Sequence, residues 1–152
     1  MIRKIAYAVL AVLAVSQFIR PPKNESIGAS SADISQVYTV PADVQRILVQ
    51  SCYDCHSNNT RYPWYAQIQP VGWWLNSHIQ EGKEHLNFSE FATYPAKKAN
   101  HKLEEVEEAV MDGWMPLDSY LWVHGDARLT PEQAQAVAEW ARQLRSRQAH
   151  AD

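Results

Sequence analysis

The sequence predicts an all-α fold, in which one domain of about four helices follows an N-terminal hydrophobic segment. In four stretches the apolar residues recur three and four positions apart, which is the spacing of one helix face. No stretch shows the alternating pattern of a β-strand, and no internal repeat is present. The 152 residues, of which 46% are hydrophobic and 20% charged, suit a single folded domain.

The first twenty residues are typical of an export segment. Arg3 and Lys4 form a short positive start, and residues 5–19 carry no charge. This run suits a signal peptide and is shorter than the ~20 residues that span a bilayer. No clean Ala-x-Ala cleavage site follows it. Two interpretations of residues 1–20 therefore stay open, a cleaved signal peptide and an uncleaved membrane anchor, and a buried core helix is the alternative without export.

Residues 21–39 are polar, contain Pro, Gly and Ser, and lack periodicity, so we expect a linker there. The folded domain is expected over residues 40–147, with residues 148–152 as a tail. Its first helix begins at Pro41, which suits a first helical turn, and runs to about Ser51. One face of this helix carries Val44, Ile47 and Leu48.

A loop is expected over residues 57–70, because Pro63 and Pro70 interrupt it. The second helix is predicted over residues 71–81, with an end near Gly82. One face of this helix gathers Trp74, Leu75, His78 and Ile79.

The third helix is predicted over residues 96–112, with Gly113 as its C-terminal stop. Its apolar stripe consists of Ala99, Leu103, Val106 and Val110, and its opposite face carries Glu104, Glu105, Glu107 and Glu108. The last helix has Thr130 as N-cap, Pro131 as its first residue and Gln133 to complete a capping box. Its buried stripe is expected to be Ala134, Val137, Ala138, Ala141 and Leu144.

The chemistry of the chain is concentrated in residues 52–56, Cys-Tyr-Asp-Cys-His, which hold the only two cysteines. C-x-x-C-H is the attachment signature of c-type haem. Two thiols at this spacing can each bond a vinyl group of one porphyrin, and the adjacent imidazole becomes an axial iron ligand. The motif therefore predicts one haem c, with its iron, per chain, bound by Cys52, Cys55 and His56.

Two other uses of the cysteine pair fit less well. A dithiol oxidoreductase places C-x-x-C after a strand in a βαβ unit, and no strand pattern is present. A zinc site would need four ligands, and a second cysteine pair is missing.

Met115 is the first choice for the sixth iron position, opposite His56. It lies in Trp114-Met115-Pro116, just after the third helix, and a thioether ligand raises the reduction potential of haem iron. The alternative is that Met115 only fills the core. His78, on the apolar face of the second helix, is the rival ligand.

Three further features near the motif suggest haem contacts. The aromatic run of residues 62–65 is expected to fold over a haem edge, and Arg61 could pair with a propionate rather than remain a solvated charge. His124 could serve as a propionate or packing partner. The six Trp and seven Tyr of the chain suit the covering of a flat apolar cofactor.

The motifs resemble those of the bacterial haem-binding domain family, a group of exported single-haem proteins similar to c-type cytochromes. The resemblance covers roughly residues 40–145, and Gly125 departs from the proline frequent in the family. The matching residues are Cys52 to Asn58, Arg61 to Tyr65, Pro70-Val71, Trp73-Trp74, His78, Asn87 to Glu90, Trp114-Met115-Pro116, Tyr120, His124 and Leu129-Thr130. The resemblance implies a cytochrome c-like fold, Met115 as distal ligand and a periplasmic location, often with a tether to the inner membrane.

The charge balance bears on partners. Of the 14 basic and 17 acidic residues, three basic and no acidic ones lie in the first twenty, so the rest carries a formal charge of −6. No basic patch for nucleic acid is present. The acidic balance favours a basic redox partner, and the glutamates of the third helix could steer its approach.

These observations favour an electron carrier over a catalyst, because protein ligands on both sides of the iron leave no place for a substrate. A haem-based sensor or a peroxide-reactive haem protein is the alternative if the distal position is open. Peroxidase chemistry would need an acid-base group, for which His78 is the candidate.

Overall fold

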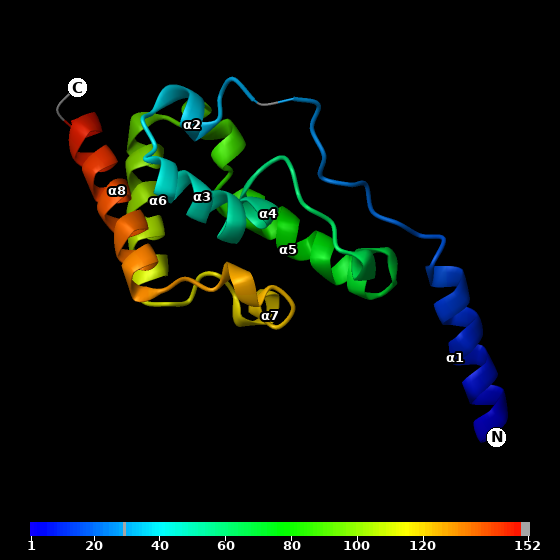
Figure 1. The fold of residues 1–152 in the computed structure, drawn as a ribbon. Coiled ribbons are helices and arrows are strands. Elements are labelled where there is room, and N and C mark those ends of the chain that lie inside the picture. The colour runs from blue at the N-terminus through cyan, green and yellow to red at the C-terminus, as the bar shows by residue number, and fades with distance from the viewer. Residues whose placement is uncertain (29, 150–152) are drawn as a thin grey trace.

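The computed structural model describes residues 1–28 and 30–149 and contains, within them, eight α-helices, three 3₁₀ helices and no β-strand (Figure 1). The all-α prediction is confirmed. The elements are α1 (Ile2–Ser16), α2 (Ile34–Val37), α3 (Ala42–Ser51), α4 (Tyr53–His56), η1 (Trp64–Gln67), α5 (Val71–His85), η2 (Phe88–Thr93), α6 (Ala96–Met111), α7 (Asp118–Leu121), η3 (Gly125–Ala127) and α8 (Pro131–Ala149).

The hydrophobic core lies where α6 and α8 pack along each other and α3 and η2 close one side (Figure 1). Removal of these apolar side chains from water is the main stabilising contribution. The core residues from these four elements include Val44, Leu48, Phe88, Phe91, Leu103, Val110, Val137 and Ala141.

The predicted stripes of α3, α6 and α8 are the faces that supply this core. α8 begins with the expected capping box, in which the Thr130 N–H donates to Gln133 Oε1 at 2.9 Å and the Gln133 N–H donates to Thr130 Oγ1 at 3.2 Å. Gly113, just after α6, has a φ of +73°, which suits the predicted glycine stop. The predicted tail begins inside α8, and its residues 150–152 lie outside the described residues.

The second predicted helix is longer than expected, since α5 continues through Gly82 to His85. A Cβ at Gly82 would lie 2.7 Å from the Cys55 carbonyl oxygen. This glycine allows two helices to approach closely and does not end one, a distinction that a single sequence does not reveal.

The stretch expected to be a linker, residues 21–39, contains α2 and contributes to the core. Asp33 caps α2 by accepting a hydrogen bond from the Ser35 N–H at 2.9 Å. Ile34 is fully buried in the main apolar cluster. The sequence did not predict this packing, because Ile34 lies in a polar stretch that lacks periodicity.

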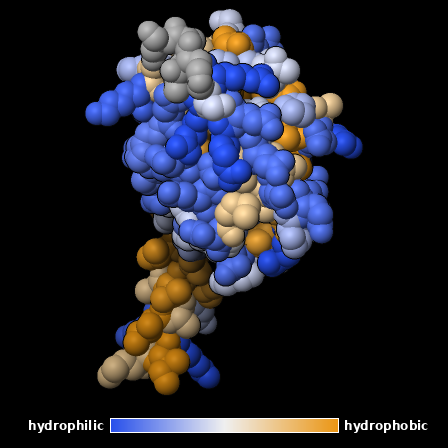
Figure 2. Space-filling view, turned by 90° about the vertical axis from the view of Figure 1, so that its left-hand side faces the viewer, coloured by the Kyte–Doolittle hydropathy of each residue, from blue (hydrophilic) through white to orange (hydrophobic). Residues whose placement is uncertain are grey.

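α1 projects from the rest of the chain and exposes its apolar side chains, as Figure 2 shows by its orange colour against a mostly blue body. Leu10 is 61% exposed and Val12 is 68% exposed, and Ser16 is the one buried residue of this helix. The alternative of a buried core helix for this segment is therefore wrong. None of the helices in the described part of the chain has both the length and the apolar character needed to cross a membrane.

The acidic face of α6 is largely paired within the protein. Arg145 bridges Glu104 at 3.0 Å and Glu107 at 3.2 Å, and Arg142 contacts Glu107 at 2.6 Å. Glu105 pairs with Lys102 on its own helix. The pairs made by Arg142 and Arg145 join α6 to α8. Much of the negative charge expected to steer a partner is therefore paired within the protein.

Candidate functional site

The residues of the C-x-x-C-H motif form one helical turn, α4, directly after α3. The Cys52 carbonyl accepts from the Cys55 N–H at 3.2 Å and from the His56 N–H at 2.9 Å. Residues three apart on a helix lie on the same side. The turn therefore presents both thiols to one side, with the imidazole next to them.

Both cysteines are free thiols whose environment opposes ionisation. Burial, aided by Cys55, raises the pKa of the Cys52 thiol to about 12. Burial, aided by Asp54, raises the pKa of the Cys55 thiol to about 11. Dithiol oxidoreductases depend on a lowered thiol pKa, and burial at this site acts in the opposite direction.

The ring of His56 is held in a defined orientation. Its Nδ1 lies 3.0 Å from the carbonyl oxygen of Leu86, just beyond α5. A carbonyl can only accept, so Nδ1 carries the hydrogen and Nε2 keeps a free lone pair. Metal-binding histidines are usually fixed in this way, by a hydrogen bond from the nitrogen that does not bind the metal. Burial lowers the pKa of His56, which favours the neutral ring that binds metals.

α5 packs closely against the motif turn α4 at Gly82. At Gly82 the helix backbone passes so near to Cys55 that a Cβ would lie within 3.0 Å of both its carbonyl oxygen and its Cβ. One turn later α5 ends and the chain delivers the Leu86 carbonyl to His56. The approach of α5 thus places both the second cysteine and the orienting acceptor of the imidazole.

Asparagines join the end of the motif to the segment around η2. Asn87 Nδ2 donates to Asn58 Oδ1 at 2.8 Å, and the Asn58 N–H donates to Ser89 Oγ at 3.1 Å. Asn58 Nδ2 also donates to Glu90 Oε1 at 3.0 Å. The two motif pieces quoted separately in the sequence, residues 57–58 and 87–90, are therefore direct hydrogen-bonding partners.

A residue that sequence reasoning missed, Asn24, fixes the loop that follows His56. Its side chain is 8% exposed, and its Nδ2 donates to the Ser57 carbonyl at 2.8 Å and to Thr60 Oγ1 at 2.9 Å. Its Oδ1 accepts from Lys83 Nζ of α5 at 2.6 Å. Asn24 lies in a polar stretch without periodicity, so only the structure identifies it as part of the site.

Arg61, which we expected to pair with a propionate or to remain a solvated charge, has a partner within the protein. Its guanidinium is engaged by Asp54, from Nε to Oδ1 at 3.1 Å and from Nη2 to Oδ2 at 3.0 Å, and Nη2 also donates to the Gln50 carbonyl. Asp54 raises the pKa of Arg61 further. A guanidinium held in this fork is already paired with a carboxylate of the protein itself.

Met115 lies half-buried on a segment separate from the motif, between α6 and α7. Its N–H donates to the Ala109 carbonyl of α6 at 3.2 Å. Further along the same segment, the Tyr120 hydroxyl donates to Asp54 Oδ2 of the motif turn at 2.8 Å. The structure thus connects the Met115 segment to the His56 segment through Asp54.

The two other histidines singled out in the sequence have protein partners. His78 Nδ1 donates to the Trp74 carbonyl one turn earlier at 3.0 Å, and its ring lies 4.4 Å from that of Trp74. His78 is half-buried, one helical turn before Gly82. His124 stacks on Tyr120 with ring centroids 4.2 Å apart and accepts from the Tyr65 hydroxyl at 3.4 Å. His124 is thus a packing partner of the aromatic residues, as one of its two predicted roles required.

Exposed tryptophans occur on the segments around the motif. Trp64 of η1 is 77% exposed, Trp74 of α5 is 46%, and Trp114 and Trp122 on either side of α7 are 53% and 82%. Trp140, on α8, is buried at 6%. Large aromatic surfaces left in water are costly unless something apolar covers them. Two thiols and an oriented imidazole on one turn, with exposed tryptophans on other segments, fit the donors and apolar surface that a porphyrin needs.

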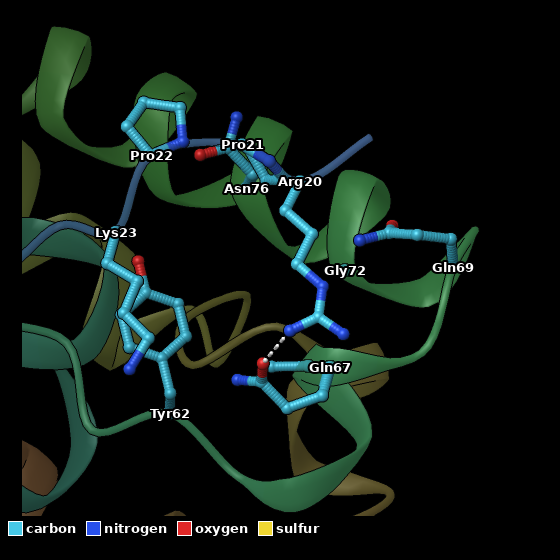
Figure 3. A pocket seen from close by; sticks show the side chains of 10 residues that line it. Arg20, Pro21, Pro22, Lys23, Tyr62, Gln67, Gln69, Gly72 and Asn76 are labelled. Carbon is cyan, nitrogen blue, oxygen red and sulfur yellow. Dashed lines mark hydrogen bonds between the residues drawn. The ribbon is translucent and has the colours of Figure 1, made fainter. Parts of the chain in front are cut away.

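A small pocket elsewhere does not belong to this site (Figure 3). It has a volume of about 130 Å³ and lies between residues 20–23 and the segment from Tyr62 to Asn76. Figure 3 shows Arg20 directed across it, with a hydrogen bond of 3.2 Å to Gln67 Oε1. Cofactor pockets are usually above about 300 Å³, so this one is too small for a porphyrin.

A helical domain with two thiols and an imidazole on one turn has the donors of a metalloporphyrin-binding protein. Comparison with protein families agrees, because the model of the haem-binding domain matches residues 11–143. The chain therefore belongs to the haem-binding domain family, and haem is its cofactor. No curated protein and no solved structure matches the chain.

The contact at Gly82 predicts the effect of a single methyl group. In most helix interiors Gly→Ala is stabilising by about 1 kcal/mol. Gly82→Ala should instead lower the free energy of unfolding by about 1–3 kcal/mol, because the new Cβ meets the Cys55 backbone. Urea denaturation measures this change. Gly125→Ala, where no atom lies within 4 Å of an added Cβ, is the control and should stay within about 0.5 kcal/mol. A Gly82→Ala protein as stable as wild type would contradict the close approach of α4 and α5.

Proposed function

We propose that the chain carries one haem c, bound through Cys52 and Cys55 with His56 as axial ligand, and that it transfers single electrons. The observation that carries this proposal is the hydrogen bond from His56 Nδ1 to Leu86, which orients the imidazole beside the two cysteines. Membership of the haem-binding domain family supports the choice of cofactor. The spacing of the two cysteines supports covalent attachment.

The attachment chemistry uses only the groups named. Each thiol adds across one vinyl group, so that a carbon–sulfur bond forms and the thiol hydrogen goes to the other vinyl carbon. No oxidant or reductant is consumed in this addition. Burial of Cys52 and Cys55, which keeps them protonated in the free chain, matches a role as thioether donors more closely than a role as redox thiols.

The bound haem supplies a one-electron couple between ferric and ferrous iron, and the protein sets its potential. We propose Met115 as the second axial ligand. Support comes from its position on a segment joined to the motif turn by the Tyr120–Asp54 hydrogen bond. His78 is the other candidate, because its Nε2 is free and it lies on the helix that packs against Cys55.

The proposed location is the periplasm, with α1 acting in export as a signal peptide or as a tether to the inner membrane. The exposed apolar surface of α1 and the two positive residues at its start support this role. The proposed partner is a redox protein, and a basic surface on it would complement the acidic balance of residues 21–152.

Covalent attachment is tested by a haem stain after denaturing electrophoresis of protein made in cells with haem c maturation. Wild type should retain the stain. The double variant Cys52→Ala/Cys55→Ala should lose it entirely, because no thioether can form. Wild-type protein without stain would contradict haem c and return both cysteines to thiol chemistry.

The axial ligand is tested by visible spectra of three proteins. The ferric wild type should show sharp low-spin bands with the weak far-red band of methionine ligation. Met115→Ala should lose the far-red band and bind carbon monoxide in the ferrous state, while His78→Ala should keep the wild-type spectrum. If His78→Ala opens the iron and Met115→Ala does not, His78 is the ligand. If the wild type itself binds carbon monoxide readily, a sensor or peroxide-reactive function replaces electron transfer.

The role of α1 is tested by fractionation of the same cells. Haem-stained protein should be on the periplasmic side, and its intact mass distinguishes a cleaved segment from a retained one. The double variant Leu10→Glu/Leu13→Glu should block export, because charges in the apolar run prevent the insertion of this segment into the membrane. Unchanged export of that variant would remove α1 from the targeting signal.

A further inference from the structure

Asp54, the second of the two residues between the cysteines, is a buried carboxylate with an unusual number of partners. It is 7% exposed and accepts four hydrogen bonds. Three come from Arg61, through its backbone N–H at 3.0 Å and the two guanidinium bonds already described. A buried charge needs such pairing, and here the pairing also fixes the plane of the carboxylate.

The orientation that Arg61 imposes directs Oδ2 toward α7. The fourth hydrogen bond arrives there, from the Tyr120 hydroxyl at 2.8 Å, across 66 positions of sequence. Burial and the adjacent carboxylate raise the pKa of Tyr120, so the hydroxyl stays protonated and continues to donate. Asp54 therefore acts as the acceptor for a segment that is remote in the sequence.

The Met115 segment is held at two ends. On one side the Met115 N–H is bonded to Ala109 of α6. On the other side, five residues later, Tyr120 is bonded to Asp54. Between these two anchors the chain is too short for Met115 to move far while both remain in place.

Other contacts on the same segment lie beyond Tyr120. His124 stacks on the Tyr120 ring, and Gln50 at the end of α3 donates to the Asp126 carbonyl. Because both contacts follow Tyr120 in the chain, neither replaces the Asp54 bond as the anchor nearest to Met115.

We propose that Asp54 is a positioning residue that, through Tyr120, holds the Met115 segment at the distance from His56 needed for six-coordinate iron. This inference rests on the proposed function, since it requires a haem between the two segments. Loss of the bond leaves the haem attached but frees the segment, so the distal position opens to external ligands. One hydrogen bond within the protein then separates a closed electron carrier from an open haem.

The test compares Tyr120→Phe with a matched variant in the full chain loaded with haem. Tyr38→Phe is the match, since it also removes one phenol hydroxyl, from a ring that packs on Phe91 of η2 away from the Met115 segment. Tyr120→Phe should reduce the far-red band and raise the fraction of ferrous protein that binds carbon monoxide by about tenfold, the effect of one hydrogen bond to a charged group. Tyr38→Phe should match wild type in both readouts. If Tyr120→Phe keeps the wild-type band and carbon monoxide binding, the inference is overturned.

Asp54→Asn provides a second variant, in which an amide nitrogen replaces Oδ2 and cannot accept from Tyr120. It should open the iron at least as much as Tyr120→Phe, because it also loses the bond from Arg61 Nη2 to Oδ2. Adding Tyr120→Phe to Asp54→Asn should open the iron no further, because the Tyr120 bond is already lost. If the effects of the two substitutions on carbon monoxide binding add in the double variant, Asp54 does not act through Tyr120. The haem stain separates the two proposals: a wild type without stain refutes the proposed function, whereas stained variants with unchanged spectra refute only the role of Asp54.

Discussion

The close approach of α5 to the motif turn is the constraint on which the site depends. With a glycine at position 82 the two backbones come near enough for the half-buried Cys55 to pack against α5. Just beyond the end of the same helix, the Leu86 carbonyl meets the His56 ring. Close packing of this kind transmits small displacements directly, because protein interiors have little empty space to absorb them. The position of Cys55 and the orientation of the imidazole therefore both depend on where α5 lies.

Hydrogen bonds from three distant stretches then stabilise the motif turn and the loop after it. Asn24 reaches them from near the N-terminal helix, Asn87 from the segment before η2, and Tyr120 from α7. Lys83 of α5 in turn fixes Asn24. Each of these side chains makes its hydrogen bond through its terminal polar group. A buried polar network of this type is stabilising only when its members are satisfied, which restricts the positions that its segments can take.

The features that the sequence predicted well are those carried by local patterns. Periodicity located α3, α6 and α8, and the Thr130–Gln133 capping box appears as expected. The C-x-x-C-H spacing predicts a haem site, and the family match supports haem as the cofactor. What could not be predicted depends on contacts between distant residues: Gly82 as a packing position, the pairing of Arg61 with Asp54, and the burial of Asn24 and Ile34. Polar or isolated residues produce no periodic signal, so their partners become known only when the chain is folded.

The hydrogen bonds between the end of α1 and the start of α5 bear on the proposed electron transfer. Gln17 exchanges two hydrogen bonds with Gln69, at 2.9 and 3.1 Å, and the Trp73 indole donates to the Ile19 carbonyl at 2.8 Å. The chain leaves α1 already fastened to the start of α5. In a protein retained by α1, these bonds would make the haem a stationary relay at a set height above the membrane. Redox partners would then have to diffuse to the haem, because the haem domain could not move toward them on a flexible tether.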